Sequence, residues 1–139
     1  MTRFFRLRRD ERGAAVIEIA IALPTLILFI WGIFQLGVAF QANAGMQHAL
    51  GEGARFATLC LNPTSTGCST PTNTAISNRI YDRVFGTNVG TFSTPIVTDG
   101  PSGEKYKDLS VTFTMPTNFL FFNGPNISIT KTKRVYVAG

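Results

Sequence analysis

A carboxylate at the mouth of a long apolar segment is the residue in this sequence that most needs a chemical explanation. Glu18 stands five residues after Gly13 and immediately before an uncharged stretch. A charged side chain in a membrane helix costs roughly 2.5 kcal/mol or more at the centre and less near the interface. If the chain is cut after Gly13, Ala14 gains an α-amino group four residues from Glu18. The amine and the carboxylate would then relieve each other's desolvation.

In a helical assembly the amine can come from a neighbouring subunit, and the pair would then also set the axial register. Two alternatives stay open for Glu18. It is either held near the lipid headgroups without such a partner, or paired with Arg12 of the same chain.

Cys60 and Cys68 form the second pair of residues with chemical potential. The seven residues between them are rich in Pro, Gly, Ser and Thr, so a turn can bring the two Cα atoms into disulfide range. Two cysteines cannot complete a four-ligand zinc site, and the single histidine, His48, is remote from them. We expect a disulfide, with two free thiols as the alternative, and no metal or cofactor.

The element that positions Glu18 is a membrane-spanning helix. Residues Ile19 to Phe40 carry no charge, and 22 helical residues extend about 33 Å, enough to cross a hydrocarbon core of about 30 Å. The alternative, a core helix of a soluble protein, would need a larger head to surround it. Pro24 removes one backbone hydrogen bond, so we expect a kink there.

The segment before Gly13 is basic. Its five arginines, Arg3, Arg6, Arg8, Arg9 and Arg12, face only two acidic residues, and the whole chain has a formal net charge of +5. A nucleic-acid-binding arm is one interpretation. Because an apolar span follows at once, we favour a cytoplasmic flank of a membrane helix, which leaves the rest of the chain outside the cytoplasm and no nucleic acid as partner.

Beyond the span, the helix is predicted to become amphipathic near residue 41 and to end near Leu61, because Pro63 disfavours helix just before it. The apolar stripe has helical spacing: Met46, Ala49, Leu50, Gly53, Ala54 and Ala57. The opposite face is polar: Gln41, His48, Glu52 and Arg55.

The C-terminal part is predicted to be an α+β head. A short helix over 74–85, capped by Thr72 or Asn73, precedes strands at 92–98, 109–115 and 126–137. These strands would form an antiparallel sheet of about three strands against the long helix. The aromatic run at 119–122 falls in a predicted loop, either as a partner contact or as head packing. We therefore divide the chain into a basic leader (1–13), a transmembrane helix (14–40), an amphipathic continuation (41–60) and an extracytoplasmic α+β head (61–139).

Residues 8–60 resemble the type IV pilin-like class, and within it the TadE-like minor pilins, or pseudopilins, of tight-adherence (Tad) pilus systems. The resemblance rests on the leader Gly13-Ala14-Ala15-Val16-Ile17-Glu18, on Leu23-Pro24 and the glycines Gly32 and Gly37 in the span, and on Gly51-Glu52-Gly53-Ala54-Arg55. Ile19 stands where the major Tad pilins tend to carry tyrosine, and the head is larger than theirs. Both departures favour a minor subunit.

The resemblance implies cleavage after Gly13 by a prepilin peptidase. It also implies an inner-membrane location before assembly and a pilus location after it, with roles in initiation, assembly or tip formation and in surface attachment. The implied partners are the peptidase, an inner-membrane assembly platform, the major pilin, other minor pilins and membrane lipid. A non-pilus alternative is a secreted or single-span protein, in which Ala42-Asn43-Ala44 would precede a signal-peptidase cut. We do not expect an enzyme, because no histidine or carboxylate constellation accompanies a nucleophile.

Overall fold

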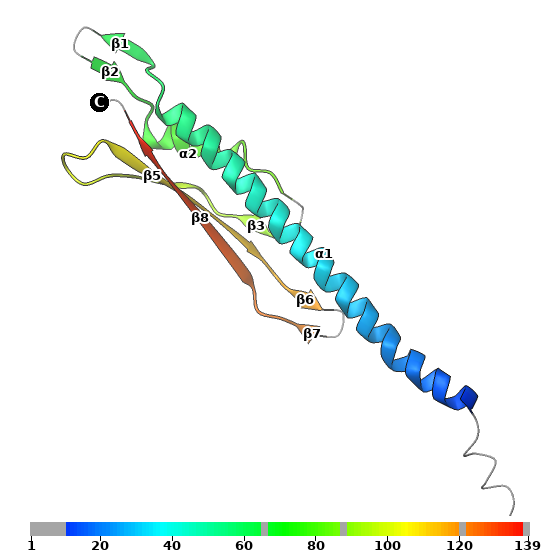
Figure 1. Cartoon of the computed structure of the whole chain (residues 1–139). Helices are drawn as coiled ribbons and strands as arrows, with labels where there is room; N and C mark the ends of the chain where they lie inside the picture. The colour runs from blue at the N-terminus through cyan, green and yellow to red at the C-terminus, as the bar shows by residue number, and fades with distance from the viewer. Residues whose placement is uncertain (1–10, 65–66, 87–88, 120–121, 138–139) are drawn as a thin grey trace, which may run out of the picture.

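The computed structural model describes residues 11–64, 67–86, 89–119 and 122–137, and shows an α+β fold built on one long helix (Figure 1). Helix α1 (Glu11–Ala57) runs the length of the molecule, and its C-terminal half lies along a β-sheet while its N-terminal half projects beyond the sheet. A second helix, α2 (Asn73–Tyr81), packs beside α1. The strands are β1 (Asn62–Thr64), β2 (Gly67–Ser69), β3 (Thr91–Phe92), β4 (Ile96–Asp99), β5 (Tyr106–Met115), β6 (Asn118–Phe119), β7 (Phe122–Asn123) and β8 (Ile127–Tyr136).

The change of character along α1 is the main feature that the sequence pattern predicts. From residue 13 to residue 37 the side chains are exposed or at most half-buried on every face of the helix. From Val38 onward one stripe is fully buried, and it recurs at helical spacing through Ala42, Met46 and Ala49 to Ala57. The opposite residues His48 and Arg55 remain exposed. The predicted amphipathic continuation is therefore confirmed.

The sheet is antiparallel and is centred on β5. Strand β8 pairs with β5 along its whole length, from Tyr106 opposite Tyr136 to Met115 opposite Ile127. Strands β3 and β4 pair with β5 one after the other, and the break between them contains Pro95, which has no N–H to donate to a neighbouring strand. The sheet thus has three rows, as expected, but four strands, because the first row is interrupted.

The core lies between α1, α2 and the face of β5 that alternates inward. Leu109, Val111, Phe113 and Met115 are buried at every second position, as the period of two predicts. Ile76 and Ile80 of α2 complete this core against the buried stripe of α1. The head is therefore one hydrophobic unit with the C-terminal half of α1.

Two predicted helix ends were wrong. Helix α1 ends at Ala57, not near Leu61, because Thr58 closes the last turn: its N–H and its hydroxyl both donate to the carbonyl of Arg55. Helix α2 ends at Tyr81 rather than at 85, since the chain turns there and Val84 N–H bonds back to Ile80 O. The start of α2 is as predicted, with the Thr72 side chain accepting from the N–H of Ala75.

The aromatic run is not a simple loop. Asn118–Phe119 (β6) and Phe122–Asn123 (β7) pair as a small antiparallel hairpin, in which Phe119 is opposite Phe122 and their ring centroids are 4.8 Å apart. Leu120 and Phe121 lie outside the described residues. The hairpin sits at the end of the sheet nearest the projecting half of α1 (Figure 1).

Candidate functional site

The projecting half of α1, residues 13–37, which we call the stem, is the first functional candidate. It is part of a helix long and apolar enough to cross a membrane, and none of its most apolar window is buried within the described chain. A core helix of a soluble protein would be covered by its own fold. The exposed stem therefore suggests a single-pass membrane anchor.

Gly13, Ala14 and Glu18 all lie on the first turns of the stem and are exposed. A helix places residues i and i+4 one above the other on the same face, so Ala14 and Glu18 are neighbours along the stem. No described residue forms an ion pair with Glu18. The basic residues Arg3, Arg6, Arg8 and Arg9 fall outside the described residues, as does the side chain of Arg12.

Pro24 lies inside α1, and the helix is continuous on both sides of it. Proline has no N–H to donate to the preceding turn. The carbonyl that loses its donor is therefore that of Ala20, four residues before Pro24. The hydroxyl of the neighbouring Thr25 bonds to the next carbonyl, that of Ile21, at 2.9 Å. The predicted kink at Pro24 stays a prediction.

The β6–β7 hairpin is joined to the stem by hydrogen bonds that sequence analysis did not predict. The carbonyl oxygen of Asn118 accepts from the indole N–H of Trp31 and from the side-chain amide of Gln35, the latter at 2.7 Å. Both donors are among the few polar groups in the stem. Trp31 and Asn118 are 87 residues apart in the chain, so no local pattern could connect them.

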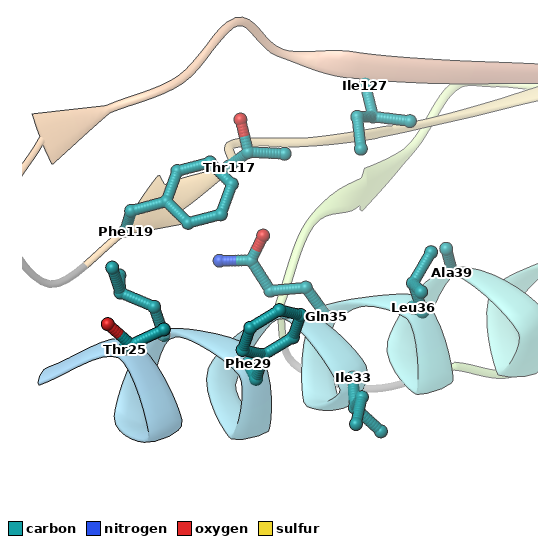
Figure 2. Close-up of a pocket in the computed structure, with 11 residues that line it drawn as sticks. Thr25, Phe29, Ile33, Gln35, Leu36, Ala39, Thr117, Phe119 and Ile127 are labelled. Carbon is teal, nitrogen blue, oxygen red and sulfur yellow. The ribbon is translucent and has the colours of Figure 1, made fainter. Parts of the chain in front are cut away.

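Between the hairpin and the stem lies an open apolar cleft of about 520 Å³. Figure 2 shows Thr117 and Phe119 on the sheet side of the cleft, facing Phe29 and Gln35 on α1. Most of the lining residues are hydrophobic, and include Leu28, Phe29, Gly32, Leu36, Phe119 and Ile127. Thr25, Gln35 and Thr117 are polar, but none of the lining side chains is charged, so the cleft suits an apolar occupant.

At the other end of α1, a disulfide joins Cys60 and Cys68, whose Cα atoms are 5.4 Å apart. It closes the β1–β2 hairpin, in which Pro63 is opposite Cys68. This end of the molecule is the farthest from the stem (Figure 1). The disulfide thus constrains a short segment just after the long helix ends.

A buried lysine is the main polar feature of the head. Lys107 is 9 % exposed, and its ammonium forms an ion pair with Asp99 and donates to Oδ1 of Asn73 at 2.6 Å. The Asn73 amide also donates to Asp99 at 2.7 Å, so the three side chains close a network that joins β5, β4 and α2. The hydrogen bonds from Lys107 and Asn73 lower the pKa of Asp99 below its usual value.

Sequence reasoning missed this network, although one signal was present. Lys107 is two residues before Leu109 and so shares the inward face of β5. A charged residue on the buried face of a strand predicts a partner. Among the described residues, no group of three or more His, Cys, Asp or Glu side chains is placed to hold a metal ion. His48 instead lies edge-on to Phe85, with ring centroids 5.7 Å apart.

Residues 13–55 match the sequence model of a family described as TadE-like protein. The matched segment begins at Gly13, contains Glu18 and Pro24, and ends at Arg55 of the amphipathic half of α1. No curated protein and no solved structure matches this chain. The segment from Gly13 to Arg55 is therefore similar to that family, and the head lies outside the match.

Proposed function

We propose that this chain is a minor pilin, or pseudopilin, of a Tad-type pilus, and that it is processed after Gly13 by a prepilin peptidase. The observation that carries the proposal is the TadE-like match, which starts at the proposed cleavage residue and includes Glu18. The exposed stem supports it, since a helix that is apolar on every face needs a cover from outside the chain. Membrane lipid provides the cover before assembly, and neighbouring stems provide it afterwards.

Cleavage would supply a positive charge to pair with the carboxylate of Glu18. The new α-amino group of Ala14, on a neighbouring subunit, would pair with Glu18 within an apolar bundle of stems. Breaking such a buried pair by removing one partner costs about 3–5 kcal/mol, because the other charge is left uncompensated. A subunit shifted along the bundle would leave both charges unpaired. The pair thus selects one axial register.

The proposed orientation follows from the charges of the leader. Arginines flank the cytoplasmic end of a membrane helix, which places the amphipathic half of α1 and the head on the exterior side. The disulfide of Cys60 and Cys68 is consistent with that compartment, since disulfides persist outside the cytoplasm. The proposed location is the inner membrane before assembly and the pilus afterwards.

The role proposed for the head is structural and not catalytic. It acts with other minor pilins, the major pilin and the inner-membrane platform in initiation, assembly or tip formation, and so in surface attachment. A secreted protein cut by signal peptidase after Ala44 is the less favoured alternative. Such a cut would remove Val38 and Ala42 from the hydrophobic core, where both are buried.

The proposal is tested by deleting the gene for this chain in its host and counting surface filaments by electron microscopy. We expect few or no filaments, and recovery when the full chain is supplied. A variant that begins at Gly45 is the negative control: it has no stem and also lacks the core residues Val38 and Ala42, so it should not restore filaments. Normal filament numbers without the chain, or full recovery with the control, would contradict the proposal.

A further inference from the structure

We infer that the β6–β7 hairpin is a membrane-dipping element, which enters the leaflet on the head's side of the bilayer and shares the apolar cleft with lipid acyl chains. The inference goes beyond the pilus role and rests only on α1 crossing a membrane. It starts from where the hairpin contacts the stem.

The position of that contact along α1 places it inside the hydrocarbon layer. A bilayer core of about 30 Å is crossed by about 20 helical residues. If the crossing begins just after Glu18, it ends near Val38, so Trp31 and Gln35 lie within it. Asn118 accepts hydrogen bonds from both of these side chains. The hairpin therefore lies at the depth of the acyl chains.

No reasonable shift of the helix removes this overlap. Moving the stem outward is limited by the charged residues that precede Gly13, and a crossing that began at Gly13 would still include Trp31. Tilting the helix lengthens the crossing, so that still more of α1 lies in the membrane. In each case the hairpin must meet lipid while the stem is inserted.

The charge pattern of the head fits this placement. The sequence has no Asp, Glu, Lys or Arg from Leu109 to Thr130, which includes the whole hairpin. The first charges beyond it, Lys131 and Lys133, border a surface pocket with Gln47 of α1. Gln47 is 12 residues beyond Gln35, or about 18 Å higher along the helix. The head thus becomes charged only above the level at which the crossing ends.

The base of the hairpin has backbone polar groups that are satisfied within the protein. At membrane depth, non-helical backbone is tolerated only where it is buried against protein or lines a water-filled cavity. The carbonyl of Asn118 has two donors from the stem, and the carbonyl of Thr117 accepts from the N–H of Gly124 at 2.7 Å. The hydroxyl of Thr117 donates in turn to the carbonyl of Pro125. The base of the hairpin is therefore closed by internal hydrogen bonds.

The exposed side chains around the cleft are those that lipid would cover. Phe122 of the hairpin is 58 % exposed, and Phe29 and Ile33 of the stem are 69 % and 68 % exposed. Ile127 extends this surface to the start of β8. Because the stem is already the lipid-facing element, the cleft is continuous with the lipid phase, and acyl chains reach it without any rearrangement.

The test uses the full chain in lipid vesicles, with one tryptophan as a depth probe. Trp31 is the single tryptophan, so Trp31→Phe gives a tryptophan-free background, in which Gln35 still donates to the Asn118 carbonyl and keeps the hairpin on the stem. Phe122→Trp in that background reports on the hairpin, and Tyr136→Trp, at an exposed position near the far end of β8, is the matched control. We expect the probe at 122 to emit at shorter wavelength and to be quenched several-fold more by lipids brominated on their acyl chains. The probe at 136 should instead be quenched by aqueous acrylamide.

Equal behaviour of the two probes would overturn the inference. Protection of position 122 that appears only at high protein-to-lipid ratio would also overturn it, since a second copy and not lipid would then cover the hairpin. Phe119→Trp in the same background provides an independent probe if the variant at 122 does not fold. These vesicles contain no other pilus component, so the outcome does not depend on whether the chain acts in a pilus.

Discussion

Gly53 of α1 lies directly against Ile80 of α2, so closely that a Cβ atom added at Gly53 would be 2.3 Å from Cγ1 of Ile80. Both residues are buried in the core of the head. Gly53 therefore lets α1 and α2 pack closely at this point, because a larger residue would clash with Ile80. Two residues earlier, Gly51 has open space, and a Cβ there would meet only the flexible end of Lys133 at 3.9 Å.

Gly53→Ala is therefore expected to destabilise the head. Overpacking a core by a single methyl group costs typically about 1–3 kcal/mol. Gly51→Ala is the matched control, and should raise stability by up to about 1 kcal/mol, because alanine favours helix where space allows. Thermal unfolding of the full chain in detergent, followed by circular dichroism, measures both. Equal midpoints for the two variants would show that the contact with Ile80 is not tight.

Acid should weaken the head through Asp99. Its pKa is lower when folded, mainly because Lys107 and then Asn73 hydrogen-bond to the carboxylate, so the unfolded chain binds the proton more readily. The stabilisation is present above the ordinary aspartate pKa near 3.8, and is lost as the pH falls through the lowered folded value. The exposed ion pair of Asp108 with Arg134 contributes in the same direction.

We expect the unfolding midpoint to be level between about pH 5 and 7 and to fall below about pH 4. Asp99→Asn should lower the midpoint at neutral pH, because Lys107 remains buried without a negative partner, and should flatten the fall in acid. Asp82→Asn, at an exposed position after α2, is the control and should leave the profile unchanged. A wild-type midpoint that does not change down to pH 3 would contradict this account.

The disulfide of Cys60 and Cys68 should be present in material prepared without reductant. The intact mass of the chain is then lower than that of the reduced chain by the mass of two hydrogen atoms. Closing so short a loop stabilises by roughly 2 kcal/mol, so a double serine variant should unfold at a lower denaturant concentration. Because the bond lies beyond the end of α1, packing between α1 and β5 should persist in the variant. Free thiols in oxidised material would contradict the assignment.

Glu18 is expected to act in assembly and not in membrane insertion. Glu18→Ala should insert into the membrane and be cleaved normally, yet give fewer pili, because the Ala14 amine of a neighbouring subunit loses its partner. Glu52→Ala removes the same charge from α1 in the head, where Glu52 forms only a long, exposed contact with Arg55, and serves as the control. Filament counts by electron microscopy check this; wild-type counts for Glu18→Ala would contradict it.

The sequence predicted the parts of the fold that repeat with a regular period. The sequence predicted both the buried stripe of α1 and the alternation of buried and exposed residues along β5, because the apolar positions of both elements face one core. The helix ends were harder to predict. The turns that follow α1 and α2 are made by local hydrogen bonds of Thr58 and Val84, which leave no periodic signal in the sequence. The interruption of the first sheet row at Pro95 was indicated by the proline itself.

Contacts between segments far apart in the chain could not be predicted from the sequence. Nothing near Asn118 indicates that its carbonyl meets Trp31, because that bond depends on how far β5 extends along α1 before the hairpin forms. The network of Lys107 similarly depends on Asn73 and Asp99 reaching it from two other elements. The residues of the proposed processing site were identified from type and spacing, and they are exposed on the first turns of the stem.

The claim on which the account depends is that a cut after Gly13 frees an amine beside Glu18. The most direct measurement is the intact mass and N-terminal sequence of the protein isolated from its native host. We predict a chain that begins at Ala14, and retention of the leader in Gly13→Leu, whose bulky residue should block the cut. Native filaments containing a chain that still carries the arginine-rich leader, or one that begins at Gly45, would contradict the account.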